Sequence, residues 1–126
     1  MSIEYVMIGT NDLDRARRFY DAVFPAIGGV LDADYPGMTF GYKFRNGTRA
    51  WIARPHDQQE ARPANGSMPG FGCASPAEVD AAHAAALAQG GTCEGAPGPR
   101  PLYGPNVYAA YARDLDGNKM SFIYDA

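Results

Sequence analysis

Apolar residues near the start of the chain recur at helical spacing. Between positions 13 and 27 they form one stripe, made up of Leu13, Ala16, Tyr20, Val23, Phe24 and Ile27. Such spacing is typical of one face of an amphipathic helix. Residues 3–9 before it have the composition of a strand, and Asn11 or Asp12 is placed to cap the helix. The pattern predicts a strand followed by a helix.

Three strands are expected after this helix. The first lies around residues 29–33, and the next two, MTFGYKF and TRAWIARP, flank Asn46-Gly47, a dipeptide typical of a tight hairpin turn. The following segment, HDQQEARPANGSMPG, is polar, contains two prolines and two glycines, and shows no periodicity. We expect residues 58–68 within it to be a linker.

The same order of elements begins again after the linker. A strand is expected in GFGCA, Ser75 and Pro76 are placed to begin a helix, and Gly90-Gly91 is placed to end it. Three more strands fit GTCEGAP, NVYAAYARD and NKMSFIYDA. The chain therefore predicts an α+β fold of two tandem βαβββ modules, about residues 1–57 and 69–126, within one domain.

The helices of the two modules allow their first strands to be matched. Leu13 and Val79, which open the two apolar stripes, lie 66 residues apart. The same spacing carries Tyr5, on the first strand of module one, onto Phe71, on the first strand of module two. We therefore expect Tyr5 and Phe71 to be equivalent.

The hairpin turns allow the last strands to be matched in the same way. The turn glycines Gly47 and Gly117 lie 70 residues apart, and this spacing carries Trp51 onto Ser121. Ser121 is a small hydroxyl in the middle of an apolar strand, whereas Trp51 is the single tryptophan of the chain. We expect the two side chains to occupy equivalent places.

Composition and charge exclude several classes of function. The net charge is −3, and no basic run is present to neutralise a row of phosphates, so we expect no nucleic-acid partner. No apolar run approaches the length of a membrane span, and the first residues lack a basic signal-peptide region. Cys73 and Cys93 form no C-x-x-C motif. These observations indicate a cytoplasmic protein with reduced thiols and no membrane partner.

Three segments carry a resemblance to a known family. They are GTNDLDRARRFYDAVF at the first strand–helix junction, VDAAHAAALAQGG in the second helix and RDLDGNKMSF at the last hairpin. In this order on a doubled module, they resemble the vicinal oxygen chelate superfamily of glyoxalase I, bleomycin-resistance proteins and extradiol dioxygenases. The resemblance implies two sheets that curl into an open barrel around one cavity, and commonly a homodimer.

The resemblance also implies where a metal would be held. In metal-using members each module provides two ligands, usually His and Glu, from its first and last strands. On this chain the corresponding positions are Tyr5, Trp51, Phe71 and Ser121. A phenol, an indole N–H, a phenyl ring and a hydroxyl are poor ligands for a divalent metal. We therefore expect no metal cofactor at these positions.

The same four residues suggest a different use of the cavity. Three planar rings form a slot for a flat or amphipathic molecule, with Ser121 as a hydrogen-bonding group. Such a binder resembles the metal-free bleomycin-resistance proteins. One alternative is a glyoxalase-type lyase or isomerase that uses a divalent metal held elsewhere, or Tyr and Ser as acid and base. Another is an interaction domain in which the rings fill the cavity.

Strand alternation extends this predicted lining. Period two adds Met7 and Cys73 to the cavity and turns Val6 and Ile8 toward the helices. Cys73 is also a candidate nucleophile, although a buried cysteine more often behaves as a small apolar residue.

Three tyrosines are further candidates for ligand binding. Tyr103 lies in a segment rich in proline and glycine and is a candidate lid residue. Tyr108 and Tyr111 are three apart on one strand and must face opposite sides. Tyr42 is placed like Tyr108, and either is a candidate for the slot.

Histidines and hairpin cations complete the candidates. His83 lies on the apolar stripe of its helix and is expected to be packed, and His56 is expected at the surface or at the cavity mouth. Arg49 and Lys119 share faces with Trp51 and Ser121 by alternation. They are expected to be solvated charges or contacts to an anionic ligand group.

Overall fold

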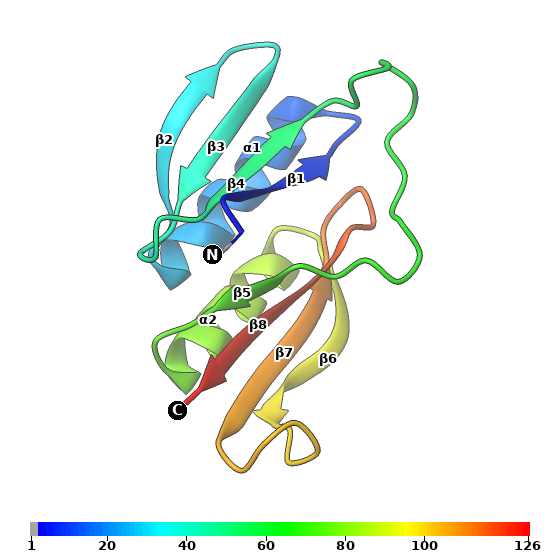
Figure 1. Ribbon diagram of the computed structural model, residues 1–126. Helices are drawn as coiled ribbons and strands as arrows, with labels where there is room; N and C mark the ends of the chain where they lie inside the picture. Colours follow the sequence, from blue (N-terminus) through cyan, green and yellow to red (C-terminus); the bar gives the residue numbers. More distant parts are fainter. Residues whose placement is uncertain (1–2) are drawn as a thin grey trace.

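The computed structural model describes residues 3–126, and the first module has the predicted order of elements. A strand and a helix come first, a short 3-10 helix follows, and three strands complete the module (Figure 1). The elements are β1 (Tyr5–Gly9), α1 (Leu13–Val23), η1 (Phe24–Ile27), β2 (Val30–Tyr35), β3 (Thr39–Lys43) and β4 (Arg49–Ala53).

The second module repeats this order without the 3-10 helix. Its elements are β5 (Gly70–Gly72), α2 (Pro76–Ala88), β6 (Thr92–Pro99), β7 (Val107–Arg113) and β8 (Lys119–Asp125). Residues 54–69 connect the modules as an extended loop. The α+β fold of two βαβββ modules is thus confirmed.

Each module forms a mixed four-stranded sheet. The strand orders are β1-β4-β3-β2 and β5-β8-β7-β6, and in each sheet the first strand pairs in parallel with the last. The edge strands β1 and β5 face each other along a line that we call the seam (Figure 1). The structure shows two sheets, and the expected curling into one barrel is not confirmed.

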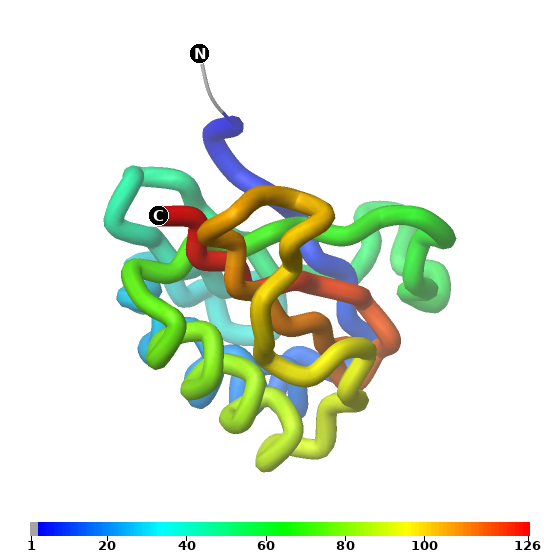
Figure 2. Tube along the Cα trace, turned by 90° about the horizontal axis from the view of Figure 1, so that it is seen from below, coloured from blue at the N-terminus to red at the C-terminus, as the bar shows by residue number. Residues whose placement is uncertain are grey.

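Both helices lie on one side of the sheets and contact each other (Figure 2). The core fills the space between helices and sheets, and Val6 and Ile8 face it as alternation predicted. The opposite surface of the sheets, which we call the open face, carries the alternate residues of each strand. No helix within residues 3–126 is long and apolar enough to cross a membrane.

The two helices begin with equivalent caps. Asp12 accepts a hydrogen bond from the backbone N–H of Arg15, 3.0 Å away, and Ser75 accepts one from the N–H of Glu78 at 3.2 Å. Asn11, the other predicted cap, instead fixes the connecting loop through two hydrogen bonds to the backbone of Ala61. The capping residues, 63 positions apart, define the repeat.

Candidate functional site

The open face of module one carries three of the predicted site residues. Tyr5 and Met7 on β1 are 53% and 62% exposed, and Met7 lies beside Trp51 of β4 in the strand register. The indole of Trp51 lies flat across Gly41 of β3, where a Cβ atom would come within 2.9 Å of the ring. Glycine at position 41 is therefore what allows the ring to rest on the sheet.

Ser121 occupies the equivalent place in module two. It lies on β8 beside Gly70 of β5, and a Cβ atom at position 70 would be 3.0 Å from the Ser121 hydroxyl. Trp51 and Ser121 are equivalent as predicted, but they belong to different sheets, with β1 and β5 between them (Figure 1). The predicted slot is therefore not one compact group of side chains.

The predicted equivalence of Tyr5 and Phe71 is wrong. Phe71 is 7% exposed and points into the core, where its ring centroid lies 5.0 Å from that of Phe24 and 5.5 Å from that of Phe44. The caps place the first strands 63 positions apart rather than 66. The two spacings differ by three residues, and a shift by an odd number moves a strand residue to the other face of the sheet. Cys73, two residues later, also lies on the core side and packs against it.

Tyr42 and Tyr108 also face the helices and not the open face. The Tyr42 hydroxyl donates to Asp21 of α1 at 2.6 Å, and the Tyr108 hydroxyl donates to Asp80 of α2 at 2.7 Å. Burial and the bond to Asp21 raise the pKa of Tyr42 far above its ordinary value. The structure therefore separates both tyrosines from Trp51 and Ser121.

Tyr111 is an open-face residue that the predicted cavity lining does not include. It lies beside Ser121 in the register, with Arg100 at 5.3 Å and Lys119 at 5.9 Å from its ring centroid. Strand alternation requires Tyr108 and Tyr111 to face opposite sides of the sheet, and this pattern could have predicted Tyr111 on the open face. Tyr103 lies in the loop between β6 and β7 and is 69% exposed.

A cavity of about 640 Å³ opens at one end of the seam, and we call it the seam cavity. The β3–β4 turn flanks it on one side, and β5 with the residues after it flanks it on the other. Its apolar walls include Val6, Ile27, Phe44, Phe71 and Cys73. Two of the predicted ligand-binding residues, Phe71 and Cys73, thus line a cavity that differs from the one expected.

The Cys73 thiol is poorly suited to act as a nucleophile. Burial, together with the negative charge of Glu78, raises the pKa of the thiol to about 11. A thiol with this pKa is almost entirely protonated at neutral pH, whereas the thiolate is the reactive form. Cys73 is better described as an apolar wall residue of the cavity.

An ion pair joins the two modules beside the seam cavity. Arg45 of the β3–β4 turn donates to both carboxylate oxygens of Glu78 on α2, at 2.7 and 3.1 Å. The hydrogen bond from Arg45 and that from the backbone N–H of Ala74 lower the pKa of Glu78. The guanidinium lies over Gly28, where a Cβ atom would be 2.5 Å from Nε.

The other end of the seam is closed by a cluster of polar groups, which we call the polar junction. The β7–β8 turn meets the start of α1 there, and the Asp116 side chain is 3% exposed. Asp116 accepts hydrogen bonds from the Thr10 hydroxyl at 2.6 Å, the Asn11 N–H at 2.9 Å and the Arg15 guanidinium at 3.0 Å.

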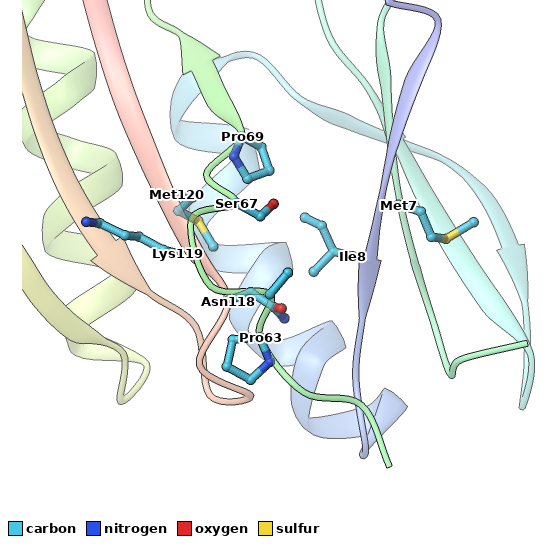
Figure 3. A pocket seen from close by; sticks show the side chains of 9 residues that line it. Met7, Ile8, Pro63, Ser67, Pro69, Asn118, Lys119 and Met120 are labelled. Atoms are coloured by element: carbon cyan, nitrogen blue, oxygen red, sulfur yellow. The ribbon is translucent and has the colours of Figure 1, made fainter. Parts of the chain in front are cut away.

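Asp114 is the second carboxylate of the polar junction. It accepts hydrogen bonds from the buried Tyr20 hydroxyl, from the Asp116 N–H, and from the N–H and side chain of Asn118. Burial raises the pKa of Asp114, and its hydrogen bonds oppose that rise. The adjoining pocket is only about 50 Å³ and is lined by Met7 and Ile8, by residues of the connecting loop, and by residues 118–120 at the start of β8 (Figure 3).

The two histidines take separate positions. His83 is 6% exposed on α2, its Nε2 atom finds no partner within residues 3–126, and burial lowers its pKa. It is packed, as expected for a residue on the apolar stripe. His56 lies exposed at the start of the connecting loop.

The donor atoms of the open face do not fit a divalent metal. The paired positions on the first and last strands are Met7 with Trp51 and Gly70 with Ser121, which together offer a thioether, an indole N–H and a hydroxyl. Within residues 3–126 there is also no group of three or more His, Cys, Asp or Glu side chains arranged to hold a metal ion. These side chains therefore offer neither an imidazole nitrogen nor a carboxylate oxygen at the paired positions.

Comparisons with known proteins agree with the fold. Residues 2–122 match the sequence profile of the Glyoxalase/Bleomycin resistance protein/Dioxygenase superfamily. The crystal structure of a glyoxalase/bleomycin resistance protein from Albidiferax ferrireducens T118 is 37% identical, with a TM-score of 0.88 over 98% of each chain. No curated protein shows significant similarity.

A more distant solved structure shows the fold alone. Lactoylglutathione lyase from Agrobacterium tumefaciens is 22% identical to this chain, with a TM-score of 0.69 over 98% of this chain and 92% of that one.

Proposed function

The chain belongs to the glyoxalase/bleomycin resistance protein/dioxygenase superfamily, and from this premise we propose that it binds a small planar or amphipathic molecule in the seam cavity without a metal. The observation that carries the proposal is the cavity itself, about 640 Å³ with the rings of Phe44 and Phe71 in its wall. Sites for small molecules are typically about 300–1,000 Å³ and mostly apolar.

The walls support an amphipathic ligand in particular. Apolar side chains line the interior, whereas Arg45, Asn46 and Thr48 of the β3–β4 turn provide polar groups along one side. A ligand with a flat apolar part and one polar end would match both regions.

The enzymatic alternative has less support from the same side chains. A general base needs a pKa near the working pH. The pKa of Tyr42 is instead raised by burial and by Asp21, and that of Tyr108 is raised by its hydrogen bond to Asp80. Both tyrosines are held by carboxylates of the helices, away from the seam cavity.

A homodimer also remains a proposal. Exposed apolar side chains lie on the open face of module one, Tyr5 and Met7 on the edge strand β1 and Val30 and Tyr35 on the opposite edge strand β2. Exposed apolar surface is typical of interaction sites. Sedimentation at several protein concentrations tests it, and a monomer throughout would contradict it.

Binding in the seam cavity can be tested with the dye anilinonaphthalene sulfonate, which is amphipathic and contains a flat naphthalene ring system. Cys73 lines the cavity and Cys93 is exposed on β6 outside it, so one chain contains both probe and control. We expect saturating dye to slow the alkylation of Cys73 by a neutral maleimide at least about tenfold and to leave Cys93 unchanged. The two sites can be separated by peptide mass spectrometry.

Two matched variants sharpen this test. Cys73→Leu places a larger side chain in the cavity wall, whereas Cys93→Leu makes the same change on an exposed strand. Dye affinity is expected to fall for Cys73→Leu and to stay at the wild-type value for Cys93→Leu. Equal protection of both cysteines, or equal dye binding by both variants, would overturn the proposal.

A further inference from the structure

Two cationic side chains stand directly opposite each other on the open face of module two. Arg113 of β7 and Lys119 of β8 are register partners. Like charges at directly opposed positions destabilise a sheet. Arg113 is partly neutralised by Glu94 at 3.2 Å and donates to the carbonyl of Gly117 at 2.8 Å. Lys119 makes no ion pair within residues 3–126.

The connecting loop turns this pair into one wall of a cavity. Residues 63–68 lie over the strands, and a space of about 410 Å³ separates them from Arg113 and Lys119. The loop contributes the polar side chains of Asn65 and Ser67. Figure 3 shows Lys119 extending away from Met7 and Ile8, so its charge is not directed into the small pocket beside them. We call the space under residues 63–68 the loop cavity.

Module one contains the equivalent pair, and the comparison shows what is unusual. Lys43 and Arg49 are also register partners, but Arg49 forms two hydrogen bonds to Asp32, at 2.7 and 3.1 Å, and lies near the charge of Glu4. The acids beside this pair thus balance its cations.

The pair in module two lies in a more positive environment. Arg100 adds a third cation nearby, 5.3 Å from the centroid of the Tyr111 ring, which Lys119 also approaches. Glu94 is the acid that contacts the pair. The loop cavity therefore combines the two cations of the pair with a partly open space beneath the loop and polar loop side chains.

We propose that the loop cavity binds a small anion carrying a phosphate or carboxylate group, held between Arg113 and Lys119. The Arg113 guanidinium, which already contacts Glu94 and the carbonyl of Gly117, offers its remaining N–H groups to such an anion, and the Lys119 ammonium adds a point charge. Asn65 of the loop lines the same space and adds a side-chain amide donor. This site is separate from the seam cavity, with which its lining shares only Met68.

Isothermal titration calorimetry with inorganic phosphate and with benzoate, at constant ionic strength set by chloride, tests the site. Wild-type protein is expected to bind at least one of these anions. Lys119→Gln is expected to weaken that binding at least about tenfold, and Lys119→Arg, which keeps the charge, is expected to retain it. The matched control Lys43→Gln removes the lysine of the corresponding pair in module one, at the position equivalent to Arg113, and is expected to bind as the wild type does.

The results also distinguish the kind of anion and the two proposed sites. Binding of phosphate alone indicates a phosphate-type ligand, and tighter binding of benzoate indicates an organic anion whose ring contacts Tyr111. Cys73→Leu, which alters the seam cavity, is expected to leave both affinities unchanged. Absence of binding heat for both anions, or an unchanged affinity in Lys119→Gln, would overturn the proposal.

Discussion

The two ends of the seam are built from equivalent elements and differ in what fills them. At one end the β7–β8 turn meets the start of α1, and a network centred on Asp114 and Asp116 leaves a pocket of about 50 Å³. At the other the β3–β4 turn meets the start of α2, and one ion pair, Arg45 with Glu78, stands beside a cavity of about 640 Å³. We infer that one end holds the modules together while the other provides space for a ligand.

The ion pairs at the two ends have opposite arrangements of charge: the helix provides the cation at one end and the anion at the other. Arg15 and Glu78 both lie three residues after the cap of their helix. Arg15 pairs with a carboxylate of the opposite turn, Asp116, whereas Glu78 pairs with a cation of its opposite turn, Arg45. The difference lies in burial, because the Asp116 side chain is 3% exposed and that of Arg45 is 55% exposed. We therefore expect the two ion pairs to contribute unequally to the free energy of unfolding, although their helix residues occupy equivalent positions.

Removing the buried carboxylate at the closed end is expected to have the largest effect. Asp114→Ala leaves the hydroxyl of Tyr20 without its acceptor and removes one of the two acceptors of the Asn118 side-chain amide, which also donates to the carbonyl of Gly9. Buried donors that lose a charged partner cost about 3 kcal/mol or more in unfolding free energy. Urea unfolding followed by circular dichroism measures this loss.

A matched control separates burial from the loss of a tyrosine contact. Asp80 also accepts a hydrogen bond from a tyrosine hydroxyl, that of Tyr108, but on the protein surface. Asp80→Ala is expected to reduce the unfolding free energy far less than Asp114→Ala. Similar losses for the two variants would contradict the assignment of the closed end as the stabilising one.

The sequence predicted the local structure of both ends because local patterns determine it. The cap at Asp12, the Pro76 helix start and the turns at Gly47 and Gly117 all depend on residues within a few positions of each other. Strand alternation likewise placed Val6 and Ile8 toward the helices.

The sequence did not predict the faces of β5, and the reason is specific. The apolar stripe begins at Leu13 in α1 but only at Val79 in α2, one helical turn after the Pro76 start. Matching stripes in place of caps shifted Phe71 and Cys73 onto the wrong face. The caps, Asp12 and Ser75, held the information that would have corrected it.

The two cavities depended on contacts that no local pattern reports. The seam cavity requires the β3–β4 turn to face β5 across the seam, and the loop cavity requires residues 63–68 to fold back over Arg113 and Lys119. The polarity of the connecting segment predicted a loop but not the surface that it covers. Tertiary packing, and not propensity, decides both sites.

The pH dependence of stability offers a smaller test of the closed end, because it alters the charge of Asp114 without removing its contacts. Burial raises the folded-state pKa of Asp114 above its ordinary value of 3.8. A raised pKa means that the folded state binds the Asp114 proton more tightly than the unfolded state does. The stability that this proton binding contributes is present at low pH and is lost as pH rises through the folded-state pKa. The unfolding free energy of wild type minus that of Asp114→Asn is therefore expected to fall from pH ~4 upward. A difference that rises over this range would contradict the direction.

The smallest effects are expected from the two ion pairs, and their inequality is the sharpest test of the comparison. Arg15→Gln leaves the buried carboxylate of Asp116 without its cation, at a cost of about 1 kcal/mol. Arg45→Gln breaks an exposed pair, which solvent and salt already weaken, so the urea midpoint is expected to stay unchanged within error. Both variants make the same chemical change at ends of the seam that the repeat relates. Equal losses of stability would mean that both ends of the seam stabilise the contact between the modules equally. This result would contradict the inference that the end beside the seam cavity serves to bind a ligand.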